Sequence, residues 1–213
     1  MKISRRLQTI ADLIPEGSKV IDIGCDHALL DIYLAMNKDC QCIAADINSN
    51  ALEQAKYNIK RFGAKNINPV LTDGLTGIEV NDSDIVVISG MGATTIEHIL
   101  SNNKASNTLI ISAHNDWELL RKTVTSLKYK IEEEAFVVDK AKGYIIIKFI
   151  KGDGEYSSED LIYGPYLIRN IEYLNYLYEK VVEVYEKIPE DSEDKSSKKR
   201  RLNEIQSLIE KLK

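Results

Sequence analysis

Two periods of hydrophobic and polar positions alternate along the first two thirds of the chain. Short apolar runs rich in β-branched residues predict strands at residues 19–23, 42–45, 66–71, 84–89 and 108–112. Between them, apolar residues that recur every three or four positions predict helices at residues 28–36, 50–62, 94–100 and 116–127. This repeated order of strand, helix and strand predicts a parallel sheet with right-handed crossovers.

The pattern changes after residue 127. Residues 128–138 and 143–150 are predicted to be strands, and the four residues 139–142 that join them leave no room for a crossover helix. We expect the two strands to pair antiparallel at one edge of the sheet. A mostly parallel, seven-stranded Rossmann-like sheet that ends in an antiparallel hairpin is the α/β organisation of class I methyltransferases. A nicotinamide-binding domain would normally continue with another crossover helix.

The last quarter of the chain carries two apolar seams with the three-and-four spacing of a coiled coil. The first seam is Ile171, Leu174, Tyr178, Val181, Tyr185 and Ile188, and the second is Leu202, Ile205, Ile209 and Leu212. Pro189 ends the first helix, and the polar residues 190–199 are predicted to be a loop. We therefore expect a first domain at residues 1–160 and an antiparallel, coiled-coil-like helical hairpin at residues 161–213. The hairpin either only packs on the first domain or binds a partner.

A further helix is expected before the first strand. Ser4 can cap its start and Pro15 ends it. Its apolar face is Leu7, Ile10, Leu13 and Ile14. Arg5 and Arg6 are then left on the other side, where they are available to a partner.

The most informative stretch is residues 20–27, in which a strand leads through Gly24 into a helix. A single glycine does not make the G-x-G-x-x-G fingerprint that brings a pyrophosphate to a helix N-terminus. The flanking acids Asp22 and Asp26 suit a ligand that carries an ammonium and a sulfonium group. They fit S-adenosylmethionine better than a dinucleotide, although Asp26 could also serve as the N-cap of the helix.

Other loops at the carboxyl ends of the predicted strands complete a cofactor site, because open α/β sheets bind ligands at that edge. Asp46, 24 residues after Asp22, could accept both hydroxyls of a ribose. Asp73 and Gly74 either meet an adenine amino group or form a plain turn, and residues 90–92 face the substrate. The predicted cofactor-binding set is Asp22, Gly24, Cys25, Asp26, His27, Asp46, Ile47, Asp73, Gly74, Gly90, Met91 and Gly92.

Composition limits the location and the partners. The 213 residues include three cysteines without a disulfide framework, no apolar leader segment and no run of about 18 apolar residues, so we expect a cytoplasmic protein with no membrane anchor. Cys40-x-Cys42 lacks a second ligand pair, so no metal is expected. The net charge of −5 argues against a generally basic nucleic-acid binder. Residues 66–160, with 9 basic and 15 acidic side chains, carry the excess of acid, so local basic patches remain possible elsewhere.

Five stretches resemble the bacterial tRNA adenine-N1 methyltransferases of the TrmK family. They are Ser-Arg-Arg-Leu-Gln-Thr-Ile at 4–10, Asp-Ile-Gly-Cys-Asp-His at 22–27, Asp-Gly-Leu at 73–75, Gly-Met-Gly-Ala at 90–93 and Tyr-Gly-Pro-Tyr at 163–166. The resemblance implies a class I enzyme with a C-terminal helical hairpin. Its cofactor would be S-adenosylmethionine and its substrate N1 of the adenine at position 22 of tRNA. We expect it to act as a monomer.

Two positions depart from the family pattern. The family typically has Gln-Pro-Asn after the fifth strand, where this chain has Ser112-Ala113-His114. Near the last hairpin it often has Lys-x-Tyr-Glu, where this chain has Ile145 in place of the acid. Both departures lie near the expected substrate face.

The predicted reaction needs groups that orient the adenine and accept a proton. Asp26 and His27 are the first candidates and His114 is another, because it replaces an amide that could have held the base. His27 could instead only satisfy a backbone group. The predicted RNA contacts are Arg5, Arg6, Lys140, Lys142 and Tyr144.

Each basic cluster could also be a solvated surface. Two other functions remain open at this point. One is a class I methyltransferase for another RNA base, a small molecule or a protein, and the other is a non-catalytic binding module.

Overall fold

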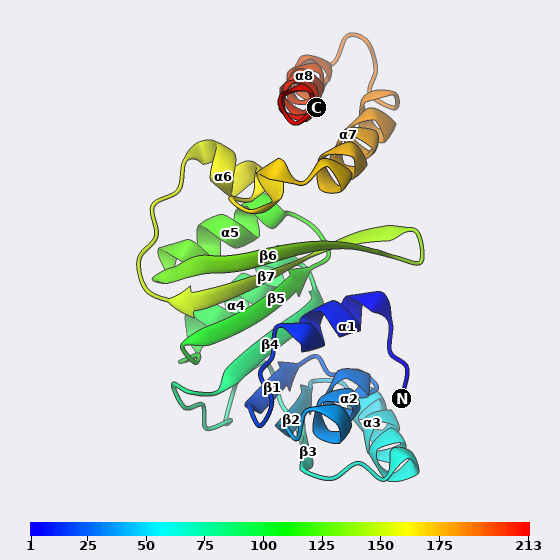
Figure 1. The fold of residues 1–213 in the computed structure, drawn as a ribbon, viewed down its shortest axis with the longest axis vertical. Coiled ribbons are helices and arrows are strands. Elements are labelled where there is room, and N and C mark those ends of the chain that lie inside the picture. The colour runs from blue at the N-terminus through cyan, green and yellow to red at the C-terminus, as the bar shows by residue number, and fades with distance from the viewer. The chain divides into compact units, whose positions relative to one another are not determined.

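The computed structural model describes residues 1–192 and 194–213, and the chain divides into two compact units. The first unit, Met1–Glu155, is a sheet flanked by helices, and the second, Tyr156–Lys213, is helical (Figure 1). The division falls five residues before the domain boundary expected from the sequence.

A seven-stranded sheet with the strand order β3-β2-β1-β4-β5-β7-β6 forms the centre of the first unit. The strands are β1 Lys19–Ile23, β2 Gln41–Asp46, β3 Ile67–Leu71, β4 Ile85–Met91, β5 Thr108–Ala113, β6 Tyr129–Asp139 and β7 Lys142–Lys151. The helices are α1 Arg5–Asp12, α2 Leu29–Asn37, α3 Ser49–Phe62, α4 Ala93–Asn102 and α5 Trp117–Ser126. The first five strands are parallel, and β7 pairs antiparallel with both β5 and β6. This arrangement confirms the Rossmann-like fold predicted from the sequence.

A tight turn joins β6 to β7. Only Lys140 and Ala141 lie between the strands, and both have positive φ angles, 49° and 61°. Two left-handed residues match the right-handed twist of a hairpin, which explains why the strands extend further than the sequence predicted. Because β7 runs antiparallel to β5, its first residues lie beside the carboxyl end of β5. The turn therefore brings Lys142 and Tyr144 to the ligand-binding edge of the sheet.

Helix α1 is fixed over one face of the sheet by its apolar side chains. Ser4 caps it as predicted, accepting a hydrogen bond from the Leu7 backbone N–H at 3.3 Å. Ile10 and Ile14 are fully buried in a cluster with residues of β1, β4, β5 and β7, among them Val87 and Ile146. Each such side chain contributes about 1.5–3 kcal/mol of burial free energy. This packing holds the first turn of α1 in place near the carboxyl ends of the strands.

The second unit contains α6 Ser158–Tyr163, a 3-10 turn at Leu167–Arg169, α7 Ile171–Tyr185 and α8 Glu193–Lys211. The helices α7 and α8 pack against each other, as expected for the predicted helical hairpin. Residues 190–199, however, are not all loop as predicted, because α8 already begins within them. Ser192 caps the helix by accepting the Asp194 backbone N–H at 3.3 Å. Lysine and arginine, which follow, are good helix formers, so a polar run need not be a loop.

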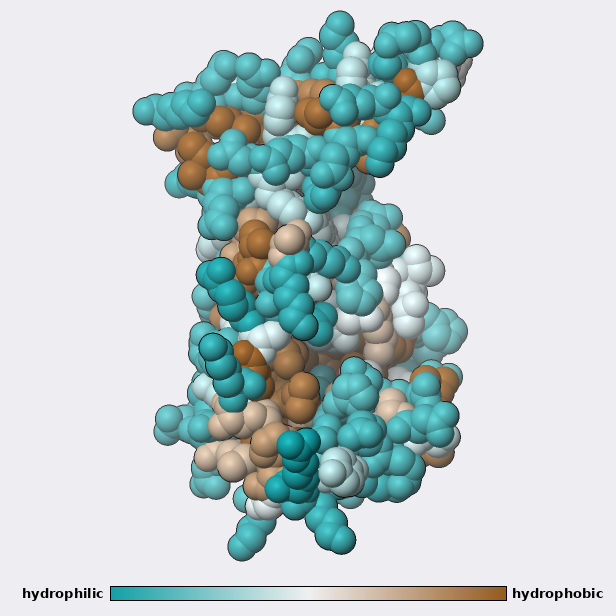
Figure 2. All heavy atoms as spheres, turned by 90° about the vertical axis from the view of Figure 1, so that its right-hand side faces the viewer, coloured by the Kyte–Doolittle hydropathy of each residue, from teal (hydrophilic) through white to brown (hydrophobic). Residues whose placement is uncertain are grey.

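The predicted apolar seams are also wrong at their ends. Ile171 is 41% exposed and Leu212 is 38% exposed, whereas Tyr173 and Leu208 are buried. A helix that is not supercoiled has more residues per turn than a strict heptad repeat requires. The buried positions along it therefore shift to neighbouring residues. Figure 2 shows the visible face of these helices as mostly hydrophilic, with separate apolar patches. In the described part of the chain, no helix is long and apolar enough to cross a membrane.

A buried ion pair connects α5 to β6. The Arg121 Nε donates to Glu134 Oε1 at 2.7 Å, and both side chains are completely buried. Removing one partner of such a pair leaves an uncompensated charge in a low dielectric, whereas replacing both with apolar groups is often neutral.

We predict that Glu134→Gln lowers the free energy of unfolding by about 3–5 kcal/mol. The double variant Arg121→Met/Glu134→Leu should recover most of that loss, and urea unfolding followed by circular dichroism measures both. The control is Asp153→Asn, which breaks the exposed Lys128–Asp153 pair and should cost less than about 1 kcal/mol. Equal losses in Glu134→Gln and the control would contradict the prediction.

Candidate functional site

The loop between β1 and α2 has an unusual backbone. Gly24, Asp26 and Ala28 all have positive φ angles, of 77°, 50° and 53°. A Cβ atom at Gly24 would also lie 2.5 Å from the Met91 Cε, so the end of the Met91 side chain would have to move to admit it. Left-handed alanine is uncommon and costs on the order of 1 kcal/mol, a strain found mostly at functional sites. Ala28, not Asp26, is the N-cap residue of α2, so the capping interpretation of Asp26 is wrong.

Backbone hydrogen bonds to the end of β2 hold this loop. The Gly24 and Cys25 N–H groups donate to the Ala45 carbonyl at 2.8 and 3.0 Å. The Asp26 N–H donates to Asp46 Oδ2 at 3.0 Å. A phosphate-binding loop offers such N–H groups to its ligand, but here they are already used within the protein. The geometry therefore supports the argument against a dinucleotide.

Asp46, at the end of β2, is held by two backbone donors. Its Oδ2 accepts from Asp26 and its Oδ1 accepts from the Asn48 N–H at 2.8 Å. Each carboxylate oxygen keeps lone-pair capacity for a further hydrogen bond. The next residue, Ile47, is 68% exposed and places an apolar side chain beside this carboxylate. Together they can hold a sugar diol and a flat ring.

Two buried carboxyl groups face each other below the loop. Asp22 on β1 is 4% exposed and Asp31 in the first turn of α2 is 0% exposed. Burial raises the pKa of Asp22 to about 7, against the lowering effects of Asp31 and of the Arg6 guanidinium. Burial and the charge of Asp22 raise the pKa of Asp31 well above its ordinary value. The charge of one carboxylate therefore disfavours ionisation of the other.

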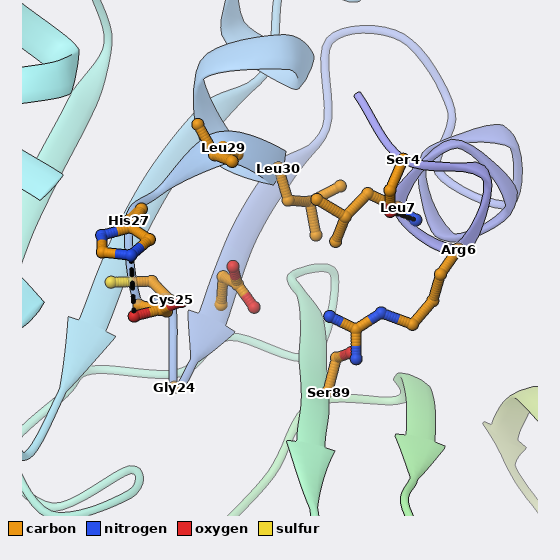
Figure 3. A pocket seen from close by; sticks show the side chains of 11 residues that line it. Ser4, Arg6, Leu7, Gly24, Cys25, His27, Leu29, Leu30 and Ser89 are labelled. Atoms are coloured by element: carbon orange, nitrogen blue, oxygen red, sulfur yellow. Dashed lines mark hydrogen bonds and ion pairs between the residues drawn. The ribbon is translucent and has the colours of Figure 1, made fainter. Parts of the chain in front are cut away.

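A cavity of about 220 Å³ lies between α1, the β1–α2 loop, the start of α2 and the end of β4 (Figure 3). Its polar lining residues include Arg6, Asp22, Asp26, His27 and Ser89. The His27 Nε2 lies 3.7 Å from the Asp26 Oδ1, and both side chains are at least half exposed. This contact is with a carboxylate and not with a backbone group. The cavity thus combines a cation with several acids.

Cys25 also lines the cavity, and it is buried. Burial, followed by the charges of Asp31 and Asp22, raises the pKa of its thiol. A thiol with a raised pKa is a poor nucleophile. Cys25 therefore shapes the wall of the cavity and does not react.

Basic and aromatic side chains gather around Gly90 beside the cavity. Arg6 Nη1 and His114 Nε2 each lie 3.8 Å from the position that a Cβ of Gly90 would take. The Tyr144 ring centre lies 5.0 Å from the Arg6 Cζ and 5.3 Å from the Lys142 Nζ. The structure therefore brings together four residues that the sequence had assigned to RNA contact or catalysis.

His114 is held in its neutral form by this neighbourhood. Partial burial and the positive charges of Lys142 and Arg6 lower its pKa, while a hydrogen bond with the Gly90 backbone acts in the opposite direction. Its backbone N–H donates to the Met91 carbonyl at 2.9 Å. The strand β4 itself continues to Met91 through a bulge, past the strand end at Ser89 that the sequence predicted.

The Asp73–Gly74 pair lies in a turn, where the Thr76 N–H donates to the Asp73 carbonyl at 3.1 Å and Gly74 has a φ angle of 56°. Asp73 does not line the cavity with Asp22, but it lines a separate hollow that includes His98. The pair thus forms a turn, and this turn leaves the Asp73 carboxylate exposed to a ligand at the same edge of the sheet.

Sequence reasoning missed Asp31 and Ser89. An acid within an apolar helical run was a possible signal for Asp31, but Ser89 gave none. In the part of the chain that the structure describes, the hydroxyls of Ser89 and of its β5 neighbour Ser112 are buried without a hydrogen-bond partner. Within the same residues, no group of three or more His, Cys, Asp or Glu side chains is placed to hold a metal ion.

Comparison with known proteins gives a consistent result. A model of the methyltransferase domain family matches residues 3–147. The chain is 31% identical to a putative tRNA methyltransferase of Mycoplasma genitalium, over 78% of this chain and 79% of that protein. It is 29% identical to the tRNA (adenine(22)-N(1))-methyltransferase of Bacillus subtilis, over all of this chain and 96% of that protein.

A solved structure extends the likeness to the whole chain. The structure of M. capricolum TrmK in complex with S-adenosyl-homocysteine is similar over 100% of both chains, with 28% identity and a TM-score of 0.85. The family match covers most of the first unit, and the Bacillus subtilis relative aligns over the whole chain. The chain therefore belongs to the TrmK family of class I S-adenosylmethionine-dependent methyltransferases.

Proposed function

We propose that the protein transfers a methyl group from S-adenosylmethionine to N1 of an adenine in tRNA, the adenine at position 22. The observation that carries this proposal is the juxtaposition of an acidic cavity with the group of Arg6, His114, Lys142 and Tyr144 around Gly90. The acids suit a cationic cofactor, and the basic and aromatic side chains suit an RNA base with its phosphates. The named functions of the Bacillus and Mycoplasma relatives agree with this assignment.

The residues present fit the cofactor. Asp22 and Asp26 offer carboxylates to its positive groups, and Asp46 is fixed to accept the two ribose hydroxyls. Ile47 offers an apolar face to the adenine, and Asp73 an acceptor for its amino group. The bound cofactor supplies an electrophilic methyl group on a sulfonium. We also propose that residues in the surrounding loops shape this site, namely Gly24, Cys25, His27, Gly74, Gly90, Met91 and Gly92.

The protein must present the target adenine and stabilise its product. The Watson–Crick edge of a paired or stacked base is inaccessible, so the base must be extruded, and Tyr144 is placed to stack on it. Methylation of N1 leaves a positive charge on the ring. Asp26, held near His27, can stabilise that charge. Neutral His114 can accept a hydrogen bond from the exocyclic amine.

Backbone phosphates of the RNA would meet the exposed cations at the same edge. Arg5 at the start of α1 and Lys140 in the β6–β7 turn are exposed, and Lys142 lies next to Tyr144. Such contacts set orientation and make affinity fall with salt. The cytoplasmic location and the monomeric state are part of the proposal, and they rest on the sequence alone.

The function is tested with tRNA transcripts and labelled S-adenosylmethionine. We predict 1-methyladenine, detected by mass spectrometry, in a transcript with adenine at position 22 and none when guanine replaces that adenine. Asp26→Asn should lower the rate roughly a hundredfold, because it removes the carboxylate while asparagine tolerates the positive φ angle. Cofactor binding without methylation of any tRNA would contradict the substrate assignment.

We predict that Asp46→Asn weakens S-adenosylmethionine binding at least about tenfold. The reason is that two backbone N–H donors and the ribose hydroxyls then lose a charged acceptor. Isothermal titration calorimetry measures the dissociation constant. The control is Asp39→Asn, which changes an exposed acid just before the start of β2. Unchanged affinity in Asp46→Asn would remove this residue from the cofactor site.

We predict that the methylation rate falls at low pH because His114 becomes protonated. Its pKa lies below the ordinary value of 6.5, so the neutral form dominates at pH 7 and is lost as the pH falls through the lowered pKa. The rate at saturating cofactor and tRNA should fall over that range in the wild-type protein but not in His114→Gln. The exposed His98→Gln serves as the control. Identical pH profiles in all three proteins would exclude His114 from the chemistry.

A further inference from the structure

We infer that Asn115, in the loop between β5 and α5, is a positioning residue for methyl transfer, because its side chain holds the start of α4 beside Gly92. The inference rests on the proposed function and deepens it. It names a residue that fixes the loop at Gly90–Gly92, on the substrate side of the site. The sequence gave Asn115 no role, although it follows His114 directly.

Helix α4 begins without a cap of its own. Its N-cap residue is Gly92, which has no side chain to accept a hydrogen bond. The first N–H groups of a helix have no partner within the helix. The Ala93 N–H instead donates to Asn115 Oδ1 at 3.4 Å, across a separation of 22 residues. Asn115 therefore gives α4 the bond that an N-cap side chain gives to other helices.

The same loop also holds the residue before Gly92. The His114 backbone N–H donates to the Met91 carbonyl at 2.9 Å. Met91 and Ala113 are the last paired residues of β4 and β5, and a bulge at Gly90 precedes them. Beyond that pair, the side chain of Asn115 continues the connection between the two loops. Consecutive residues of one loop thus hold the other loop on both sides of Gly92.

Gly92 itself fits closely against the Asn115 amide. A Cβ atom at Gly92 would lie 3.3 Å from Asn115 Oδ1, so the amide would have to move by a few tenths of an ångström. The φ angle of Gly92 is −75°, which any residue can adopt. The contact with Asn115, and not the backbone conformation, therefore favours glycine at this position.

This connection joins the two halves of the proposed site. Met91 lies over the β1–α2 loop, because its Cε would meet a Cβ at Gly24. Asn115 ties the same segment to the loop that carries His114. A displaced segment would change the position of the target base relative to the cofactor. Misplacement by about 1 Å can lower a rate a hundredfold. Asn115 would thus act on the rate through Gly92 without touching the reactants.

The test separates the rate from cofactor binding. Asn115→Ala should lower kcat for tRNA methylation roughly 10- to 100-fold at saturating cofactor and tRNA. Calorimetry should show unchanged affinity for S-adenosylmethionine, because Asp46 keeps both of its backbone donors. Asn115→Asp should restore most of kcat, since it keeps an acceptor oxygen and a negative charge is favourable at a helix N-terminus.

The matched control is Asn170→Ala. It removes another asparagine Oδ1 that accepts a hydrogen bond at the start of a helix, from the Tyr173 N–H of α7 at 3.0 Å. This variant should keep the wild-type kcat. A loss of kcat equal to that of Asn115→Ala would show that any weakened helix start has the same effect, and would overturn the inference.

A second variant tests the contact from the other side. Gly92→Ala should displace the Asn115 amide and lower kcat in the wild-type background. In the Asn115→Ala background, the same change should have little further effect, because the two residues act as a unit. Two effects on kcat that simply multiply in the double variant would contradict the inference.

Other outcomes also overturn the inference. They are a wild-type kcat in Asn115→Ala, equal losses in Asn115→Ala and Asn115→Asp, and a loss of cofactor affinity that matches the loss of kcat. If Asn115→Ala does not fold by circular dichroism, Gly92→Ala with Asn115→Asp replaces it, and a wild-type kcat in Gly92→Ala counts against the inference. A wild-type protein that binds cofactor but methylates no tRNA would instead reject the proposed function.

Discussion

The β1–α2 loop keeps its shape because the end of β2 accepts its backbone N–H groups. The Ala45 carbonyl takes two of them, and the Asp46 carboxylate takes a third. These bonds support left-handed residues that would otherwise be unfavourable, at Asp26 and Ala28. They also occupy the donors that a phosphate would need. The loop is therefore committed to a ligand that is recognised by side-chain carboxylates.

Negative and positive side chains lie on different sides of Gly90. On one side, Asp22 and Asp26 line the cavity, and on the other, Lys142 lies next to Tyr144. Arg6 lies at the boundary, because it lines the cavity and its guanidinium Cζ lies 5.0 Å from the centre of the Tyr144 ring. The net charge of −5 is compatible with RNA binding because the cations are placed locally. The acids are needed for a positively charged cofactor.

The sequence predicted the order of strands and helices and the loops at the carboxyl ends of the strands, because apolar periodicity and glycine positions are local signals. It was wrong about the start of α8, since local composition cannot separate a polar helix from a polar loop before the Ser192 cap is known. It missed Asp31 because the partner of that acid, Asp22, lies on another element. The closeness of His114 and Tyr144 to Gly90 likewise depends on the sheet order, which brings β7 next to β5.

The most direct test of this account is a crystal structure of the protein with bound S-adenosyl-homocysteine. Both ribose hydroxyls should contact the Asp46 carboxylate, and the amino-acid end should lie in the cavity that Asp22 lines. The Gly24–Ala28 backbone should keep its left-handed residues. A ribose bound away from Asp46, with the amino-acid end outside the cavity, would contradict the account.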